Sequence, residues 1–108
     1  MMDWYVIDYL YPNALKKFID TMFPNIGMPS ISTLEFYDIK RLYNFFDKNG
    51  VYLYVEMYSK DQWVFTISLN NGVVFGPTQN SKKTREDAEC DGFSECFKLM
   101  EKIILDKI

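Results

Sequence analysis

Histidine is missing from this 108-residue chain, and its absence removes the usual general base and the commonest transition-metal ligand. Cysteine occurs only twice, and two cysteines without histidine cannot form a standard structural zinc site. Glycine is also scarce, and the five glycines are scattered rather than gathered in a phosphate-binding motif. The sequence therefore predicts no catalytic residues, no metal site and no cofactor, and so a protein that is not an enzyme.

Long apolar runs and a strong net charge are absent as well. No segment approaches the roughly 18 apolar residues of a membrane span. The apolar stretch from Trp4 to Tyr11 is interrupted by Asp8 and has no basic region before it, which does not fit a secretory signal. The net charge of −3 differs from the positive charge usual in nucleic-acid binders. We expect a cytoplasmic protein with no membrane partner, and nucleic acid is the less favoured partner.

Aromatic residues are abundant, with nine Phe, eight Tyr and two Trp in a chain of 48% hydrophobic composition. A chain of this length can bury one sizeable core, so we expect a single domain over residues 1–108. Its two cysteines, Cys90 and Cys96, stand six residues apart in one predicted helix, about 9 Å along the axis. That separation is too large for a disulfide, and the sequence predicts free thiols.

Three segments have helical patterns. Pro12 suits the first turn of a helix that ends before Pro24. A second helix is predicted from Ser32, which forms a capping box with Glu35, to Asn49–Gly50. The third follows Thr84.

The last predicted helix contains Gly92, which costs about 1 kcal/mol relative to Ala inside a helix. We interpret it as a close approach of this helix to the sheet. The run from Trp4 to Tyr11 is either a strand or a packing arm, and its pattern does not separate the two.

Between the second and third helices the apolar pattern changes to a period of two. Residues 51–58 and 62–69 alternate and predict a β-hairpin, and a short third strand is predicted over 73–75. The expected fold is α+β in the order α–α–β–β–β–α, a three-stranded antiparallel sheet with helices packed on one face. Residues 1–35 are expected to form an N-terminal arm and helix, and residues 36–108 a helix, a β-meander and a helix.

The outer face of the predicted sheet is the first candidate binding surface. Alternation places Tyr52, Tyr54 and Tyr58 on this face, with Val64 and Thr66 on the neighbouring strand. Tyrosine is enriched at protein interfaces, so the face predicts a site for a protein partner. The alternatives are that residues 4–11 fold back over it, or that the tyrosines only favour strand structure.

Two charged clusters flank the start of the last helix. One is acidic and suits the positive end of the helix dipole, as an ordinary solvated face would: Glu86, Asp87, Glu89 and Asp91. Its functional interpretation is a second partner-binding surface that imitates nucleic-acid phosphates. The other is basic and comprises Lys82, Lys83 and Arg85.

The basic cluster is similar to the lysine-rich segment of double-stranded RNA-binding domains, which also combine a helix, three strands and a helix. This resemblance implies that Lys82, Lys83 and Arg85 contact RNA phosphates. The acidic cluster directly after them departs from that family.

A second resemblance covers residues 36–104. The string LYNFFDKNGVYLY and the string TREDAECDGFSECFKLME resemble the patterns LYxFFDxxGIYI and TRxEAExxGFxxAF of small uncharacterised proteins of phages and mobile elements. The resemblance implies a bacterial-host cytoplasm but no chemistry.

These observations lead to three functional hypotheses. The first is a non-enzymatic inhibitor that binds a host protein, most specifically an anti-CRISPR protein that blocks a Cas effector or its RNA complex. The second is a small RNA-binding module, and the third is an accessory protein that forms a homodimer through the tyrosines of the sheet. The expected oligomeric state is a monomer or a weak homodimer.

Overall fold

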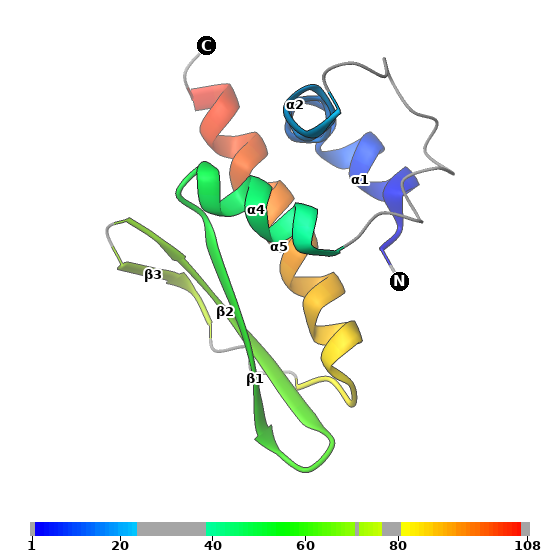
Figure 1. Ribbon diagram of the computed structural model, residues 1–108, viewed down its shortest axis with the longest axis vertical. Helices are drawn as coiled ribbons and strands as arrows, with labels where there is room; N and C mark the ends of the chain where they lie inside the picture. Colours follow the sequence, from blue (N-terminus) through cyan, green and yellow to red (C-terminus); the bar gives the residue numbers. More distant parts are fainter. Residues whose placement is uncertain (1, 24–38, 71, 77–80, 107–108) are drawn as a thin grey trace.

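The computed structural model describes residues 2–23, 39–70, 72–76 and 81–106. Within these residues the chain order is α1 (Trp4–Leu10), α2 (Pro12–Met22), α4 (Ile39–Lys48), β1 (Tyr52–Ser59), β2 (Gln62–Leu69), β3 (Gly72–Phe75) and α5 (Arg85–Asp106). Figure 1 shows the strands on one side of α4 and α5 and the helices α1 and α2 on the other.

The predicted order α–α–β–β–β–α is wrong, and so is the regular three-stranded meander, because the third strand is short and irregular. The described residues contain four helices, because residues 4–10 form α1 rather than a strand or an extended arm. The regular sheet is the two-stranded antiparallel hairpin of β1 and β2. β3 has four residues and pairs with β2 at three positions, with a register shift between Ile67 and Ser68. The broader α+β class is compatible with this arrangement.

α1 is stabilised as a helix by a side-chain cap at its N-terminus and by burial of one of its sides. The Asp3 carboxylate accepts a hydrogen bond from the Val6 amide at 3.2 Å, which caps the first turn. Trp4 and Ile7, three residues apart, are the buried residues of this helix. The Trp4 ring stacks on Phe18 of α2 and meets the edge of Phe97 of α5, so α1 joins the helical side of the molecule.

The other predicted elements agree more closely with the structure. α2 begins at Pro12 and ends at Met22. The hairpin strands lie within one residue of their predicted ranges. The Thr84 hydroxyl accepts a hydrogen bond from the Asp87 amide at 3.1 Å and caps α5 as predicted. The proposed capping box of Ser32 and Glu35 lies outside the described residues.

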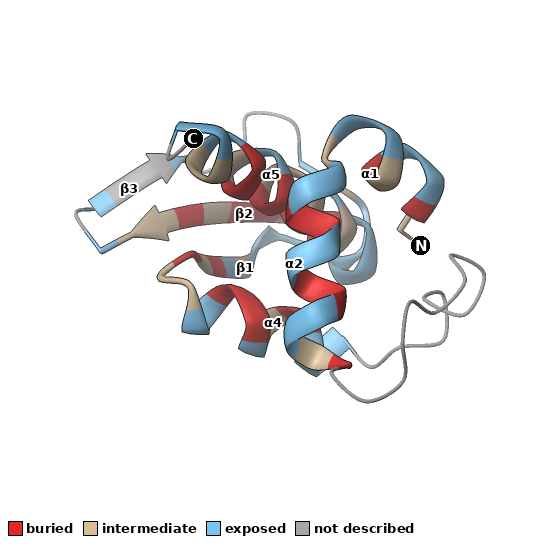
Figure 2. Ribbon diagram, turned by 90° about the horizontal axis from the view of Figure 1, so that it is seen from above, coloured by how far each residue is buried: buried red, intermediate tan, exposed pale blue. Residues whose placement is uncertain are grey.

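The core lies between α5, the hairpin and the other three helices. Leu53, Phe65 and Ile67 are buried on the inner face of the sheet. α2 and α4 are amphipathic, and in Figure 2 their ribbons alternate between buried and exposed segments. Aromatic rings fill most of the helical side, with contacts that run from Trp4 and Phe18 through Phe45, Phe46 and Phe97 to Phe93.

Gly92 marks a close approach of α5 to the sheet, as the sequence predicted. A Cβ atom at this position would lie 2.6 Å from Cδ1 of Leu53, which is closer than two carbon atoms can approach. A residue without a side chain therefore lets the helix lie directly on β1.

Candidate functional site

The outer face of the hairpin carries the predicted tyrosine surface. Tyr52 pairs with Ser68, Tyr54 with Thr66 and Glu56 with Val64, so these side chains share one face. Tyr54 is 56% exposed and Tyr58 is 78% exposed, whereas Tyr52 and Thr66 are half-buried. We call Tyr52 and Tyr54, together with Tyr58 at the register shift that ends the strand, the tyrosine face.

Val64 was predicted to belong to this surface, but the structure buries it to 6% exposure. Its strand is flanked on both sides at this point. β1 lies on one side, and on the other Lys82 forms two backbone hydrogen bonds with Trp63 at 2.7 and 2.8 Å. Sequence alternation does not reveal this second neighbour, because Lys82 lies 19 positions further along the chain.

The end of the hairpin adds a residue that the prediction missed. Met57 is on the inner-facing side of β1, opposite Trp63, yet it is 60% exposed. In Figure 1 the hairpin extends beyond the start of α5, which explains why its end is open on both faces. From Glu56 to Ser59 every residue of β1 is exposed.

The alternative that residues 4–11 cover the tyrosine face is wrong. α1 packs on α2 and α5, and both Figure 1 and Figure 2 place it across the helical layer from the sheet. α1 instead carries an exposed apolar side of its own, formed by Tyr5, Val6, Tyr9 and Leu10. A helical wheel would have shown these residues opposite Trp4 and Ile7 once the segment was known to be a helix.

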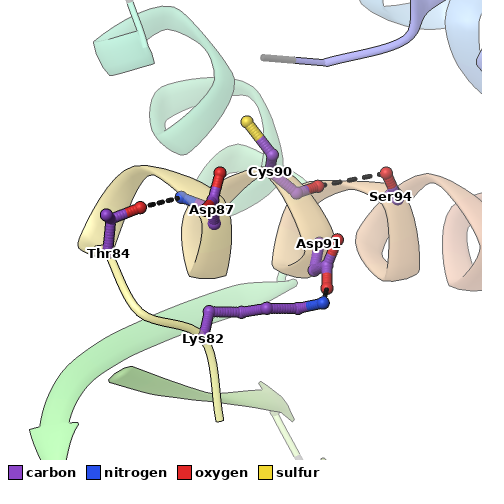
Figure 3. Close-up of polar contacts among 6 residues, drawn as sticks. All are labelled: Lys82, Thr84, Asp87, Cys90, Asp91 and Ser94. Carbon is purple, nitrogen blue, oxygen red and sulfur yellow. Dashed lines mark hydrogen bonds and ion pairs between the residues drawn. The ribbon is translucent and has the colours of Figure 1, made fainter. Parts of the chain in front are cut away.

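The basic and acidic clusters, predicted as separate sites, are partly joined in ion pairs. Lys82 Nζ lies 2.9 Å from Asp91 Oδ2 (Figure 3), and this hydrogen bond raises the pKa of Lys82. Arg85 Nε lies 3.4 Å from Glu89 Oε1, one helical turn away. Two of the three basic side chains thus have carboxylate partners, and their role in binding RNA phosphates stays a prediction.

Glu89 is also unsuited to its predicted role as an exposed partner-binding residue, because only 8% of it is exposed. Its Oε2 accepts a hydrogen bond from the Tyr43 hydroxyl at 2.9 Å. Burial and this carboxylate raise the pKa of Tyr43 above its usual value. Glu89 therefore connects α4 to α5, and Glu86 and Asp87 are the exposed members of the acidic cluster besides Asp91.

Both cysteines are free thiols, as predicted. Burial raises the pKa of Cys96 and of Cys90, which disfavours the reactive thiolate. Among the residues that the structure describes, no three Cys, Asp or Glu side chains are grouped so that they could hold a metal ion.

Glu101 is a buried carboxylate whose role the sequence did not indicate. It is 7% exposed and accepts hydrogen bonds from the Ala14 amide at 2.8 Å and from Asn13 Nδ2 at 2.7 Å. Tyr11, at the N-cap of α2, makes no side-chain cap, so Glu101 of α5 caps that helix instead.

An apolar hollow between the sheet and α5 was also not predicted. It has a volume of about 340 Å³ and is lined by Ile67, Phe75 and Leu99, with charged side chains beside them: Glu95, Lys98 and Lys102. The Phe75 ring stacks on Phe65 with centroids 5.4 Å apart. The hollow is large enough for an apolar side chain of a bound molecule.

Comparisons of the chain with protein-family models, with curated proteins and with solved structures give no match. None of the helices in the described part of the chain has the length and apolar character that crossing a membrane requires.

Proposed function

We propose that this protein acts without catalysis, by binding another protein through its tyrosine face. The observation that carries the proposal is the exposure of Tyr54, on a sheet face over which α1 does not fold, and of Tyr58 at the end of the same strand. Tyrosine combines a large apolar ring with a hydroxyl that can still form hydrogen bonds, which suits a surface that alternates between water and a partner.

The exposed Met57 beside these rings supports the same proposal. A flexible thioether next to rigid aromatic rings can adapt to the shape of a partner. Aromatic residues and methionine are enriched in protein interfaces, whereas charged residues are depleted from their centres. We therefore place the contact at the hairpin end rather than at the start of α5, where Glu89 is buried and Asp91 is paired with Lys82.

The specific form of the proposal is an inhibitor of a bacterial defence system, with a Cas effector as its target. It rests on the resemblance of residues 36–104 to small phage proteins and on the acidic composition. The ion pairs of Lys82 and Arg85 give no support to RNA binding as the principal activity.

A binding experiment with purified Cas effector–guide complexes tests the proposal. The tagged protein is incubated with each complex, with and without nuclease, and capture is compared for wild type, the double variant Tyr54→Ala/Tyr58→Ala and the control Tyr9→Ala. Tyr9 is a matched control because it is an 85% exposed tyrosine on α1, across the helical layer from the sheet.

We expect capture that survives nuclease, is retained by Tyr9→Ala and is reduced at least tenfold by the double variant, since interface aromatic residues contribute about 1–4 kcal/mol each. Equal capture by the double variant and wild type would exclude the tyrosine face. If no Cas complex is captured, the same variants are compared in a pull-down from a bacterial lysate. If the lysate yields a partner whose capture depends on Tyr54 and Tyr58, the proposal of protein binding through the tyrosine face stands and the proposal of a Cas target is excluded.

A further inference from the structure

The outer edge of β1 is the longest unpaired strand edge among the described residues. The sheet order β1–β2–β3 places β1 at one end, with eight residues from Tyr52 to Ser59. In Figure 1, α4 lies beside the start of β1 and diverges from it, and no described helix lies beside the second half of the strand. This half is the fully exposed stretch from Glu56 to Ser59.

Up to Met57, this edge lacks most of the features by which proteins usually prevent strand pairing. β1 contains no proline, and its inward-facing side chains Leu53, Val55 and Met57 carry no charge. Glu56 is its one charged residue, and it points to the outer face. The register shift lies between Met57 and Ser59, so the strand is regular up to Met57.

The sequence of β1 is complementary to itself in one antiparallel register. If Val55 lies opposite Val55 of a second copy, Leu53 lies opposite Met57 and Tyr54 opposite Glu56, and each pair occurs twice. The apolar residues then meet on the inner face, where Met57 is now 60% exposed. On the outer face, the Tyr54 hydroxyl can donate a hydrogen bond to the Glu56 carboxylate.

Two registers shifted towards the end of the strand are less favourable. A shift that centres the pair on Glu56 places two carboxylates opposite each other, which is destabilising. A shift that centres it on Met57 places the irregular segment between Met57 and Ser59 next to the centre of the ladder, whereas the register centred on Val55 meets that segment only at its ends.

We propose that two copies of this chain pair through β1, antiparallel and centred on Val55, to form one continuous sheet across a two-fold axis. The tyrosine faces of the two copies then lie side by side on the same side of that sheet. A single strand pair buries less than the roughly 1,200 Å² typical of stable complexes, so the dimer is weak and depends on concentration. It requires no other protein and is therefore tested independently of the proposed partner.

Sedimentation and cross-linking of the purified protein test this pairing. Val55→Cys, in a Cys90→Ser/Cys96→Ala background, places two thiols opposite each other on the two-fold axis. Directly opposite Cα atoms in an antiparallel pair are about 4.5–5.5 Å apart, within the range of a disulfide. Glu56→Cys in the same background is the control, since its thiol would face Tyr54 of the other copy.

We expect the wild-type mass to rise from monomer towards dimer between micromolar and millimolar concentrations, and mild oxidation to cross-link Val55→Cys but not Glu56→Cys. A monomer at every concentration, or cross-linking of Glu56→Cys in preference to Val55→Cys, would overturn the proposal.

Tyr54→Glu and Tyr54→Lys provide a second test in case Val55→Cys does not fold. Both replace an exposed side chain, but Glu would face Glu56 of the other copy and Lys would form an ion pair with it. We expect the dimer of Tyr54→Lys to be about tenfold tighter than that of Tyr54→Glu, because the pair occurs twice. Equal dissociation constants for the two variants would contradict the register.

Discussion

Replacement of Glu101 by Ala should destabilise the protein by about 3 kcal/mol. Glu101 is buried and holds the first turn of α2 through two hydrogen bonds, from the Ala14 amide and from Asn13 Nδ2. A hydrogen bond to a charged group contributes about 1.5–3 kcal/mol, and a carboxylate at a helix N-terminus adds about 0.3–1 kcal/mol. The cost of keeping this carboxylate out of water reduces the sum of these terms.

The loss should be large because α2 has no local substitute for Glu101. Its N-cap residue, Tyr11, makes no side-chain hydrogen bond to the helix. In Glu101→Ala the buried Ala14 amide has no hydrogen-bond acceptor. This accounts for about 1–3 kcal/mol of the expected loss in the free energy of unfolding. α2 also packs against both α4 and α5, so loosening its first turn affects the aromatic core around Phe18.

Urea unfolding followed by circular dichroism measures this effect. We expect Glu101→Gln to lose about 1–2 kcal/mol, because its carbonyl oxygen can still accept the Ala14 hydrogen bond while the charge is gone. Asn13→Ala should lose about 1 kcal/mol, since it removes one hydrogen bond. Lys102→Ala, an exposed neighbour on α5, is the control and should stay within about 0.5 kcal/mol of wild type. If Glu101→Ala stayed within the same range, the capping role assigned to Glu101 would be refuted.

Gly92→Ala should destabilise the protein by about 1 kcal/mol in urea unfolding, because displacement of Leu53 outweighs the gain in helix propensity. The loss of stability should be smaller when Leu53 is also replaced by Val. If the effects of the two substitutions on the free energy of unfolding simply added, the contact between Gly92 and Leu53 would be contradicted. Stability should fall as the pH rises above about 10, because the pKa of Tyr43 is raised in the folded state and the unfolded state loses its proton first. Unfolding at a series of alkaline pH values should show a smaller fall for Tyr43→Phe, and an equal fall would exclude Tyr43 as the cause. Duplex RNA should not bind measurably at physiological salt in fluorescence anisotropy, because Lys82 and Arg85 have carboxylate partners; tight binding that Lys82→Ala abolishes would contradict this expectation.

The elements that the sequence predicted well depend on neighbours in the chain. The hairpin followed from an alternation of period two, and the pairing of Leu53 with Ile67 and Val55 with Phe65 brings its apolar residues together. The cap of α5 followed from Thr84, whose hydroxyl reaches an amide three residues away. The role of Gly92 was also predicted, because glycine is unfavourable inside a helix and a close contact with a neighbouring element offsets that cost.

The first helix was missed because an almost continuously apolar segment has no clear period. Trp4 and Ile7 become its buried side only when α2 and α5 are present to cover them. Asp3 was the local indication of a helix start, since its carboxylate caps the first turn. The same uncertainty led us to consider that this segment covers the sheet, which it does not.

The amino-acid sequence by itself determined the α+β class, the hairpin, the free thiols and the placement of Tyr52 and Tyr54 on one face of β1, because each follows from spacing along the chain. Only the tertiary structure decided which charged residues remain available. Arg85 and Glu89 are four residues apart, but Lys82 reaches Asp91 because the chain before α5 runs beside β2. The sequence alone gives no reason to place Glu101 anywhere but on the surface, as is usual for a glutamate. In the fold it is a buried helix cap, and its two partners lie 87 and 88 positions away in the chain. Contacts between distant segments have no periodic trace in the sequence, and they arise only when the core brings those segments together.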